Sequence, residues 1–542
     1  MIFLLTLLGS VLLTIALIPM FSVAAVRFNA VDFPNERKVH TRPIPRIGGV
    51  AMALGTFVPL LYAFRENDFL VAYLTGSSIL VLFGIVDDFR ELSPKVKFTG
   101  QIVAALIAVF YGGVVIRSLG TLLSEGWALP SWSAVPLTIF VIVGVTNAIN
   151  LADGLDGLAG GICLLIFAGI GYLAYLAGNT TIGLISLALG GALFGFLRFN
   201  THPATIFMGD AGSQFLGFSV VILAIALTQG SKVYSPILPL ILVGFPVLDT
   251  LTVMILRITR GRSPFSADKN HFHHHLMKLG FLHPQSVLII YVLQTTLVIA
   301  AIMFRYYSDW LLFTGYLSFC FAVLAVFSLA ERNGWRSQEF ERFNQRLKNW
   351  FGKLKREGRV IKTTFPLFEY GIPFLLIITC LLTTDVPPFV SIAAAFCGGS
   401  LLIAVFLRNR LAPVILRFAL YMLIPCAVYF SDLQSQKCLH GTALSVYNGA
   451  FGIFALLMIF VSKFSRRNEG FKSTPLDFLI IILAVVVPNL PDQRIQEYRI
   501  GLSAAKIIML YFSFEVLLAE LRGRSGRLCL GVIASLTLLA LH

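Results

Sequence analysis

The stretch LAGGICLLIFAGIGYLAYLA at residues 158–177 carries no charged side chain and is long enough to cross a bilayer as a helix. About 20 apolar residues, at about 1.5 Å each, span about 30 Å of hydrocarbon. Similar stretches recur along all 542 residues, of which 57% are hydrophobic and 13% charged, with a mean hydropathy of +0.84. A soluble chain of this length would need far more polar surface. The sequence therefore predicts an all-α, polytopic membrane helix bundle.

Apolar runs separated by polar loops divide this bundle into a ten-helix core, residues 1–305, and about eight further membrane helices. We expect residues 306–365 to form an extra helix and a basic interfacial linker, and residues 366–542 to form C-terminal membrane helices of unknown role. The expected helices are 2–26, 47–64, 69–86, 98–116, 135–152, 158–177, 181–197, 211–228, 235–256, 286–304, 309–330, 366–384, 388–407, 412–430, 443–462, 475–489, 502–520 and 528–541.

The net charge of +15 follows the topology of the chain. If successive loops lie on alternate sides of the membrane, one side receives nearly all the Lys and Arg, mainly within 27–46, 90–97, 257–278 and 332–362. An excess of Lys and Arg marks cytoplasmic loops. The charge therefore predicts a bilayer protein with its N-terminus outside and no nucleic-acid partner. Most of the seven cysteines fall in apolar stretches, which favours buried thiols over disulfides.

Acidic residues, two pairs and a single aspartate, stand at the ends of the expected helices on the basic side. In GIVDDFRELSPKVKFTGQ, residues 84–101, Asp87 and Asp88 end one helix and Lys97 begins the next. Neighbouring carboxylates raise each other's proton affinity, which suits a metal site or a general base, whereas Lys97 suits a phosphate. A solvated helix end is the structural alternative.

A second acidic segment, NAINLADGLDGLAGG at 147–161, places Asn150, Asp153 and Asp156 three residues apart, on one face of a helical turn. Its glycines let a ligand approach the backbone. Oxygen ligands beside a diphosphate favour Mg²⁺ or Mn²⁺ over zinc. In RFNTHPATIFMGDAGSQFLG, residues 198–217, Asp210 opens a helix, either as a ligand or as an ordinary cap.

Two further loops on this side are cationic. The loop DFPNERKVHTRPIPRIGG at 32–49 suits a diphosphate or a lipid phosphate, with a plain basic loop as the alternative. The loop RITRGRSPFSADKNHFHHHLMKLG at 257–280 contains His271, His273, His274 and His275 among Arg and Lys. We expect these imidazoles to bind phosphates rather than zinc, since the flanking cations would repel a divalent metal.

VDDFRELSPKVKFTGQ, NAINLADGLDGLAGG, FNTHPATIFMGDAGS and NHFHHHLMKLG, in this order, resemble the polyprenyl-phosphate N-acetylhexosamine-1-phosphate transferases of glycosyltransferase family 4. The resemblance covers about residues 1–305. The histidine loop lacks the Pro and the acid of the peptidoglycan branch, which transfers phospho-MurNAc-pentapeptide. It is more similar to the branch that transfers GlcNAc-1-phosphate from UDP-GlcNAc to undecaprenyl phosphate and begins a lipopolysaccharide or cell-wall polymer.

The resemblance implies a bacterial inner-membrane enzyme with its active site on the cytosolic face. It implies that Asp210 ligates Mg²⁺ (Mn²⁺ is the other candidate ion), that Asp153 helps to form this metal site, and that Asp88 deprotonates the acceptor phosphate. The catalytic residues would be Asp87, Asp88, Asp153 and Asp156; the substrate-binding residues would be Lys97, Asn150, His271, His273, His274 and His275. Lipid phosphate would attack the β-phosphorus of a UDP-N-acetylhexosamine and release UMP.

Two other functions were weighed. An intramembrane prenyltransferase would carry two DxxxD-type motifs on helices, and an ion-coupled transporter would place charges near mid-helix. The C-terminal helices show no acid or histidine cluster at a helix end, so we assign them no catalysis and expect them to dock a pathway partner or to bind lipid. A homodimer is an alternative assembly. In 331–362, aromatic and leucine residues at helical spacing predict a helix on the inner leaflet or a soluble packing surface.

Overall fold

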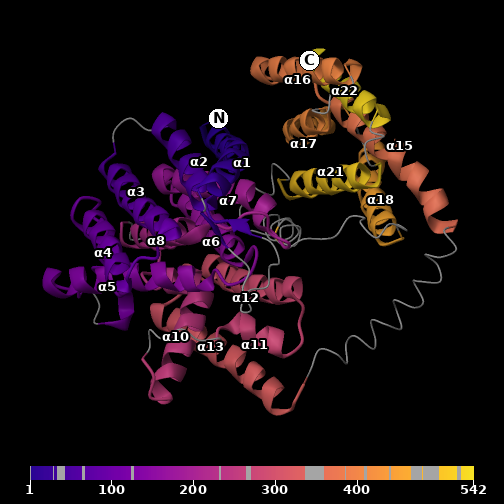
Figure 1. Ribbon diagram of the computed structural model, residues 1–542. Helices are drawn as coiled ribbons and strands as arrows, with labels where there is room; N and C mark the ends of the chain where they lie inside the picture. Colours follow the sequence, from indigo (N-terminus) through magenta and orange to yellow (C-terminus); the bar gives the residue numbers. More distant parts are fainter. Residues whose placement is uncertain are drawn as a thin grey trace. The chain divides into compact units, whose positions relative to one another are not determined.

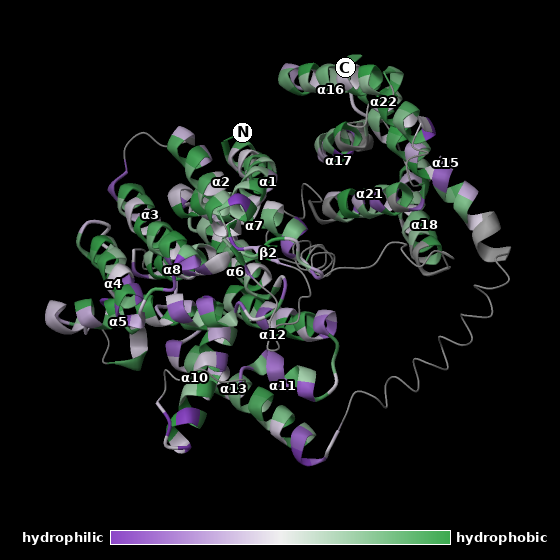
Figure 2. Ribbon diagram, in the orientation of Figure 1, coloured by the Kyte–Doolittle hydropathy of each residue, from purple (hydrophilic) through white to green (hydrophobic). Residues whose placement is uncertain are grey.

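The computed structural model describes residues 2–28, 30–32, 43–63, 67–123, 127–230, 233–263, 270–335, 359–384, 386–407, 412–438, 441–464, 479, 500–521 and 526–541. Most of these residues are helical (Figure 1). Eleven of the described helices are long and apolar enough to cross a membrane, judged by length and composition. Hydrophobic residues cover most of each helix, and hydrophilic ones gather toward helix ends and connections (Figure 2). The predicted all-α, multi-pass membrane bundle is confirmed.

The chain divides into two compact units, the first made of Met1–Ser337 and Thr474–Leu479. A two-stranded antiparallel ribbon, β1 (Val31–Asp32) with β2 (Ile44–Pro45), follows its first helix. The helices of this unit are α1 (Ile2–Arg27), α2 (Gly48–Ala63), α3 (Asp68–Phe89), α4 (Pro94–Phe110), the 3₁₀ turn η1 (Gly120–Leu122), α5 (Ser131–Ala152), α6 (Leu158–Leu176), α7 (Thr180–Asn200), α8 (Gly209–Gln229), α9 (Leu238–Leu242), α10 (Gly244–Thr259), α11 (Phe272–Lys278), α12 (His283–Met303) and α13 (Asp309–Arg332).

Helix α8 is the centre of the first unit. Nearly all of its side chains are buried, and α2, α3, α5 and α6 pack against it. A helix buried on nearly every side lies in the interior of its bundle, away from the lipid. The residues that begin α8 are therefore surrounded by the ends of several neighbouring helices, where we expect the polar side chains to meet.

The expected single helix at 235–256 is wrong, because the structure has two helices, α9 and α10, with a break at Val243. Pro246 has no amide hydrogen and cannot donate to the carbonyl of Leu242 one turn earlier. The side chain of Gln294 in α12 donates to that carbonyl instead, at 2.8 Å. Tyr316 of α13 donates to the carbonyl of Gly244 at 2.9 Å. These two bonds satisfy the carbonyls on both sides of the break.

Other boundaries also differ from the expectation, since α15 begins at 359 rather than 366 and α17 ends at 438 rather than 430. Helix α4 spans 94–110 rather than 98–116: Pro94 lies at the start, where its missing amide hydrogen costs nothing, and Gly113 follows the end with φ of +67°. The histidine loop, expected to be irregular, contains the short helix α11.

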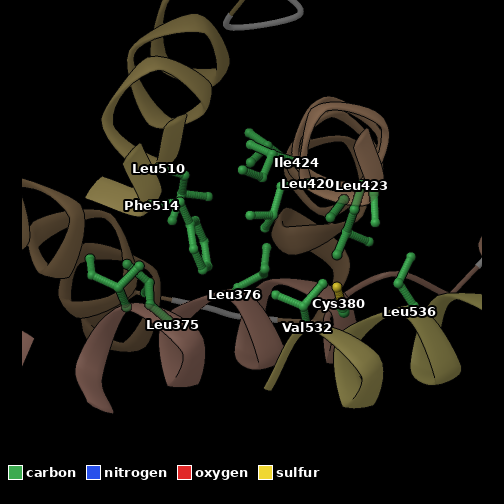
Figure 3. Packing of buried hydrophobic residues seen from close by; sticks show 14 of the residues in the cluster. Leu375, Leu376, Cys380, Leu420, Leu423, Ile424, Leu510, Phe514, Val532 and Leu536 are labelled. Atoms are coloured by element: carbon green, nitrogen blue, oxygen red, sulfur yellow. The ribbon is translucent and has the colours of Figure 1, made fainter. Parts of the chain in front are cut away.

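The second unit comprises Gln338–Ser473 and Ile480–His542. Its described helices are α15 (Arg359–Leu381), α16 (Pro388–Phe406), α17 (Ala412–Cys438), α18 (Thr442–Phe464), α21 (Ile500–Leu521) and α22 (Gly526–Leu541). Leucines and other apolar side chains of α15, α17, α21 and α22 meet in one core (Figure 3). Lys506 of α21 is buried there against Asp432 of α17. The expected helix at 475–489 and the aromatic pattern of the basic linker lie outside the described residues, apart from Leu479.

Candidate active site

Two glycine contacts bring α3 and α2 against the first turn of α8. A Cβ atom at Gly84 would lie 2.3 Å from the Cα of Ala211, and one at Gly49 would lie 2.2 Å from the amide nitrogen of Gly212. Any side chain would collide with this backbone. The last turn of α3, one turn beyond Gly84, is consequently placed beside the first turn of α8.

Asp88, in that last turn of α3, caps α8. Its Oδ1 accepts a hydrogen bond from the amide of Asp210 at 2.9 Å, and its Oδ2 accepts one from the amide of Ala211 at 3.3 Å. The first amides of a helix lack partners within it and carry partial positive charge. The Asp88 carboxylate thus anchors the start of α8. Its role in deprotonating the acceptor stays a prediction.

Lys97 joins the carboxylates of α3 and α8. Its ammonium group forms an ion pair with Asp87 and lies 3.6 Å from Oδ2 of Asp210. Asp87 is buried, and its Oδ1 also accepts the amide of Leu92 at 2.7 Å. A single cation therefore lies between two acids that are 123 positions apart in the sequence, which accords with the prediction that these three side chains share one site.

Asn150 approaches Asp210 from α5. Its amide nitrogen donates to Oδ1 of Asp210 at 2.7 Å and to the hydroxyl of Ser213 at 2.7 Å. Among the described residues, no hydrogen bond occupies the amide oxygen of Asn150. One turn along the same helices, Gln101 bonds to Asn147 and Gln214, with 2.7 Å between the Asn147 amide nitrogen and Gln101 Oε1. This buried network fixes α4, α5 and α8 relative to one another beneath the acids.

Asp153 follows the last turn of α5 and completes the acidic group. Burial raises its pKa to about 7, and the charges of Asp210 and Asp156 add to this effect, while Arg46 opposes it. The two neighbouring carboxylates that add to the effect of burial show that negative charge gathers here. A divalent cation bound by oxygen atoms would relieve that crowding.

Asp156 forms a second, adjoining cluster with two histidines. Its Oδ2 accepts His202 Nδ1 at 2.9 Å and the amide of Ala204 at 3.1 Å, and its own amide donates to His283 Nε2 at 3.1 Å. Burial alone would raise the pKa of Asp156, but the bonds from His202 and Ala204 bring it below its ordinary value. The two imidazoles stack with centroids 4.2 Å apart. Asp156 is thus ionised and held in a hydrogen-bonded triad.

Suitable atoms of Asp156, His202 and His283 all lie within 4.8 Å of one another, a spacing that could hold a metal. Nε2 of His283 already accepts an amide hydrogen, and its buried Nδ1 has no hydrogen-bond partner among the described residues. Sequence reasoning did not select either histidine, although His202 lies in the quoted segment 198–217. The position of His202, eight residues before Asp210, was the signal in the sequence that could have identified it.

Two of the four histidines of this loop bond to acidic side chains, and the other two lie at the turn that carries Asp153 and Asp156. His271 bonds to Asp249, and His275 Nδ1 lies 2.5 Å from Oε1 of Glu331 in α13. The ring of His273 lies against the backbone at Gly154, where a Cβ would come within 2.4 Å of it. His274 packs on His273 with ring centroids 4.2 Å apart. The histidine helix α11 therefore rests on the turn between Asp153 and Asp156.

Burial, together with a smaller effect of the neighbouring His274, lowers the pKa of His273 to about 3, against the opposing effect of Asp249. His273 is therefore neutral and offers a hydrogen bond rather than a positive charge. In the cationic loop at 32–49, Arg46 pairs with Asp32. Arg37, Lys38, His40 and Arg42 of that loop lie outside the described residues.

Known proteins are similar to this chain in sequence. The model of glycosyl transferase family 4 matches residues 70–228. A probable undecaprenyl-phosphate N-acetylglucosaminyl 1-phosphate transferase of Bacillus subtilis strain 168 is 38% identical over 341 residues, which are 62% of this chain and 93% of that protein. The chain belongs to glycosyl transferase family 4. The predicted family is confirmed.

Other family 4 relatives differ in the lipid that their names specify. A decaprenyl-phosphate N-acetylglucosaminephosphotransferase of Mycolicibacterium smegmatis is 35% identical, over 52% of this chain and 78% of its own length. An undecaprenyl-phosphate α-N-acetylglucosaminyl 1-phosphate transferase of Escherichia coli K12 is 29% identical, over 60% and 90%. The first relative leaves 38% of this chain unmatched, so a large part of it has no counterpart there.

Proposed function

We propose that this family 4 enzyme transfers N-acetylglucosamine-1-phosphate from UDP-GlcNAc to undecaprenyl phosphate, releases UMP and thereby begins a cell-envelope polysaccharide. The observation that carries the proposal is the convergence of Asp87, Lys97 and Asn150 on Asp210. These side chains come from four helices and combine acids with a cation and an amide. Such a set suits the transfer of a phosphoryl group between two anionic substrates. The names of the family 4 relatives support this sugar and this lipid.

We further propose that Asp210 and Asp153 hold Mg²⁺, with Mn²⁺ as the alternative. Both residues offer the carboxylate oxygens that these ions prefer, and the amide oxygen of Asn150 adds a third oxygen close to Asp210. The raised pKa of Asp153 supports the assignment, because a dication would offset the crowded charge that raises it. When bound, the ion would offset charge on the diphosphate and on the departing UMP.

The side chains around this ion would bind the substrates and accept the proton of the lipid phosphate. Lys97 would contact a phosphate, moving between Asp87 and the substrate. Asp88 would accept the proton of the lipid phosphate through the lone pairs that its two backbone hydrogen bonds leave open. The neutral His273 would help to orient the nucleotide diphosphate, and the ionised Asp156 would help to shape the metal site. Direct displacement at the β-phosphorus by the lipid phosphate accounts for all of these roles.

Localisation in the bacterial inner membrane, with the site on its cytosolic face, follows from the excess of Lys and Arg in the loops that join these helix ends. A UDP-sugar is soluble and the lipid acceptor is not. The site must therefore open to water at the membrane surface where the donor is present. We propose the same face for the ion and for both phosphates.

The test uses membranes that contain the full-length chain, radiolabelled UDP-GlcNAc and undecaprenyl phosphate. We expect Asp210→Ala to lower the transfer rate by at least about 100-fold. Asp68→Asn is the matched control, since it removes an acid from the first turn of α3, the end opposite Asp87. Near wild-type transfer by Asp210→Ala would refute the proposed site.

Competition among UDP-GlcNAc, UDP-GalNAc and UDP-MurNAc-pentapeptide separates the GlcNAc enzyme from the peptidoglycan alternative. Exchange of labelled UMP into UDP-GlcNAc, in the presence of undecaprenyl phosphate, separates a transferase from a transporter or a prenyltransferase. We expect UDP-GlcNAc to compete best and the exchange to require the lipid. Preferential use of UDP-MurNAc-pentapeptide would contradict the proposed donor.

A further inference from the structure

Asp249 is a buried acid in α10 to which the proposed reaction gives no role. The residue is 5% exposed, and both of its side-chain oxygens have partners at the start of the histidine helix α11. Oδ2 lies 3.0 Å from Nδ1 of His271, and Oδ1 accepts the amide of Phe272 at 2.8 Å. One carboxylate therefore holds both the residue before α11 and the first residue within it.

These bonds determine which nitrogen of His271 carries a fixed proton. An ionised carboxylate only accepts hydrogen bonds, so the proton between Asp249 and His271 lies on Nδ1. With one proton on the ring, Nε2 is a hydrogen-bond acceptor. A carboxylate that orients an imidazole in this way often affects function through its partner, as it does for metal-binding histidines.

The same bonds place α11 over the acidic turn. A seven-residue helix has little stability of its own and depends on tertiary anchors. Phe272 packs edge-on against Phe245 of α10, with centroids 5.4 Å apart. His273, one position later, lies against Gly154. A shift at Asp249 would therefore move the imidazoles relative to Asp153 and Asp156.

We propose that Asp249 is a positioning residue for phosphosugar transfer, which keeps the proton of His271 on Nδ1 and leaves Nε2 to accept a hydrogen bond from a hydroxyl group of the nucleotide sugar. The inference rests on the proposed function. The inference requires a carboxylate at position 249. A side chain that only caps α11 needs an oxygen that accepts the Phe272 amide hydrogen, whereas a side chain that holds the His271 proton on Nδ1 must be an ionised carboxylate.

Asp249→Asn separates these two roles. The amide oxygen of Asn can still accept the Phe272 amide hydrogen, but its NH₂ group donates to Nδ1 and moves the imidazole proton to Nε2. We expect kcat/KM for UDP-GlcNAc to fall about 10- to 100-fold, mainly through a higher KM for the donor, while KM for undecaprenyl phosphate is unchanged. Asp249→Glu keeps the carboxylate and should recover part of the loss.

Asp309→Asn is the matched control. Asp309 is also buried, and it likewise accepts a backbone amide, that of Thr121, at 2.7 Å, together with the hydroxyl of Ser235, but no histidine. Thermal unfolding of both variants reports what the loss of a buried carboxylate does to stability alone. Rates are expressed per folded protein, measured by size-exclusion chromatography of the detergent-solubilised chain.

A double variant supplies a second readout. If Asp249 acts through His271, then Asp249→Asn combined with His271→Gln should be no slower than His271→Gln alone. Multiplied effects, or an Asp249→Asn variant with wild-type donor KM, would overturn the inference and leave the proposed function intact. Failure of the wild-type chain to transfer GlcNAc-1-phosphate would instead overturn the proposed function and, with it, the inference.

Discussion

Replacing Gly84 by Ala should separate the carboxylates that we propose as catalytic, without changing any polar group. The added Cβ would lie 2.3 Å from the Cα of Ala211 and 2.4 Å from its amide nitrogen, about 1.1 Å short of the 3.4 Å where ordinary contact begins. Both obstacles are backbone atoms at the start of α8. No side-chain rotation can make room, so α3 and α8 must move apart by about that distance.

The displacement has two measurable costs. Overpacking of a well-packed interior typically costs about 1–3 kcal/mol of stability. A misplacement of about 1 Å at a reacting centre can cost about 100-fold in rate. Since Asp88 caps Asp210 across this contact, we expect the transfer rate per folded protein to fall about 10- to 100-fold, with a lower thermal midpoint.

The assay is transfer of labelled GlcNAc-1-phosphate to undecaprenyl phosphate by Gly84→Ala, set beside thermal unfolding in detergent. Gly144→Ala is the matched control, because a Cβ at Gly144 of α5 meets no atom within 4 Å. The control should keep wild-type activity and stability. A Gly84→Ala variant that keeps both would refute the claim that this glycine contact sets the geometry of the site.

Three further outcomes are expected. Asn150→Asp replaces the amide that donates to Asp210 by a like charge, so transfer should fall at least about 100-fold while the variant stays folded; wild-type rates in the membrane assay would contradict this. Removal of divalent ions with EDTA should abolish transfer, with recovery on adding Mg²⁺ and to a lesser degree Mn²⁺; full activity in EDTA would exclude the proposed ion. In the second unit, Lys506→Met leaves the buried Asp432 without its lysine partner and should cost about 3–5 kcal/mol of unfolding free energy. The double variant Lys506→Met with Asp432→Leu should cost less. Equal losses in thermal or denaturant unfolding would contradict this.

Much of the candidate site was visible in local sequence. Asp87, Asp153 and Asp210 stand out because acids are rare in an apolar chain, and each lies where an apolar run begins or ends. The alternation of the loops then predicted that these ends share one side of the membrane. Which of the acids touch could not be predicted, since Asp87 and Asp210 are brought together only by the packing of α3 and α4 against α8.

The residues that sequence reasoning missed depend on partners far along the chain. Asp249 lies in the middle of an apolar segment, and an acid in such a place was a signal that an anchored partner existed. Its partner His271 comes 22 positions later, beyond a loop whose path the sequence does not specify. The triad of Asp156, His202 and His283 likewise joins three separate connections.

The sequence by itself determined that the chain is a membrane helix bundle and where most of its helices lie, because helix length and apolar composition are properties of neighbouring residues. It also determined the family, because the motifs are short local segments. The tertiary structure decided where α9 and α10 separate, since the carbonyl that Pro246 leaves unpaired is satisfied by Gln294 of another helix. It also decided which carboxylate caps which helix. Such contacts depend on the shapes of packed helices. At Gly84, the absence of a side chain lets α3 and α8 approach closely enough for Asp88 to reach the start of α8.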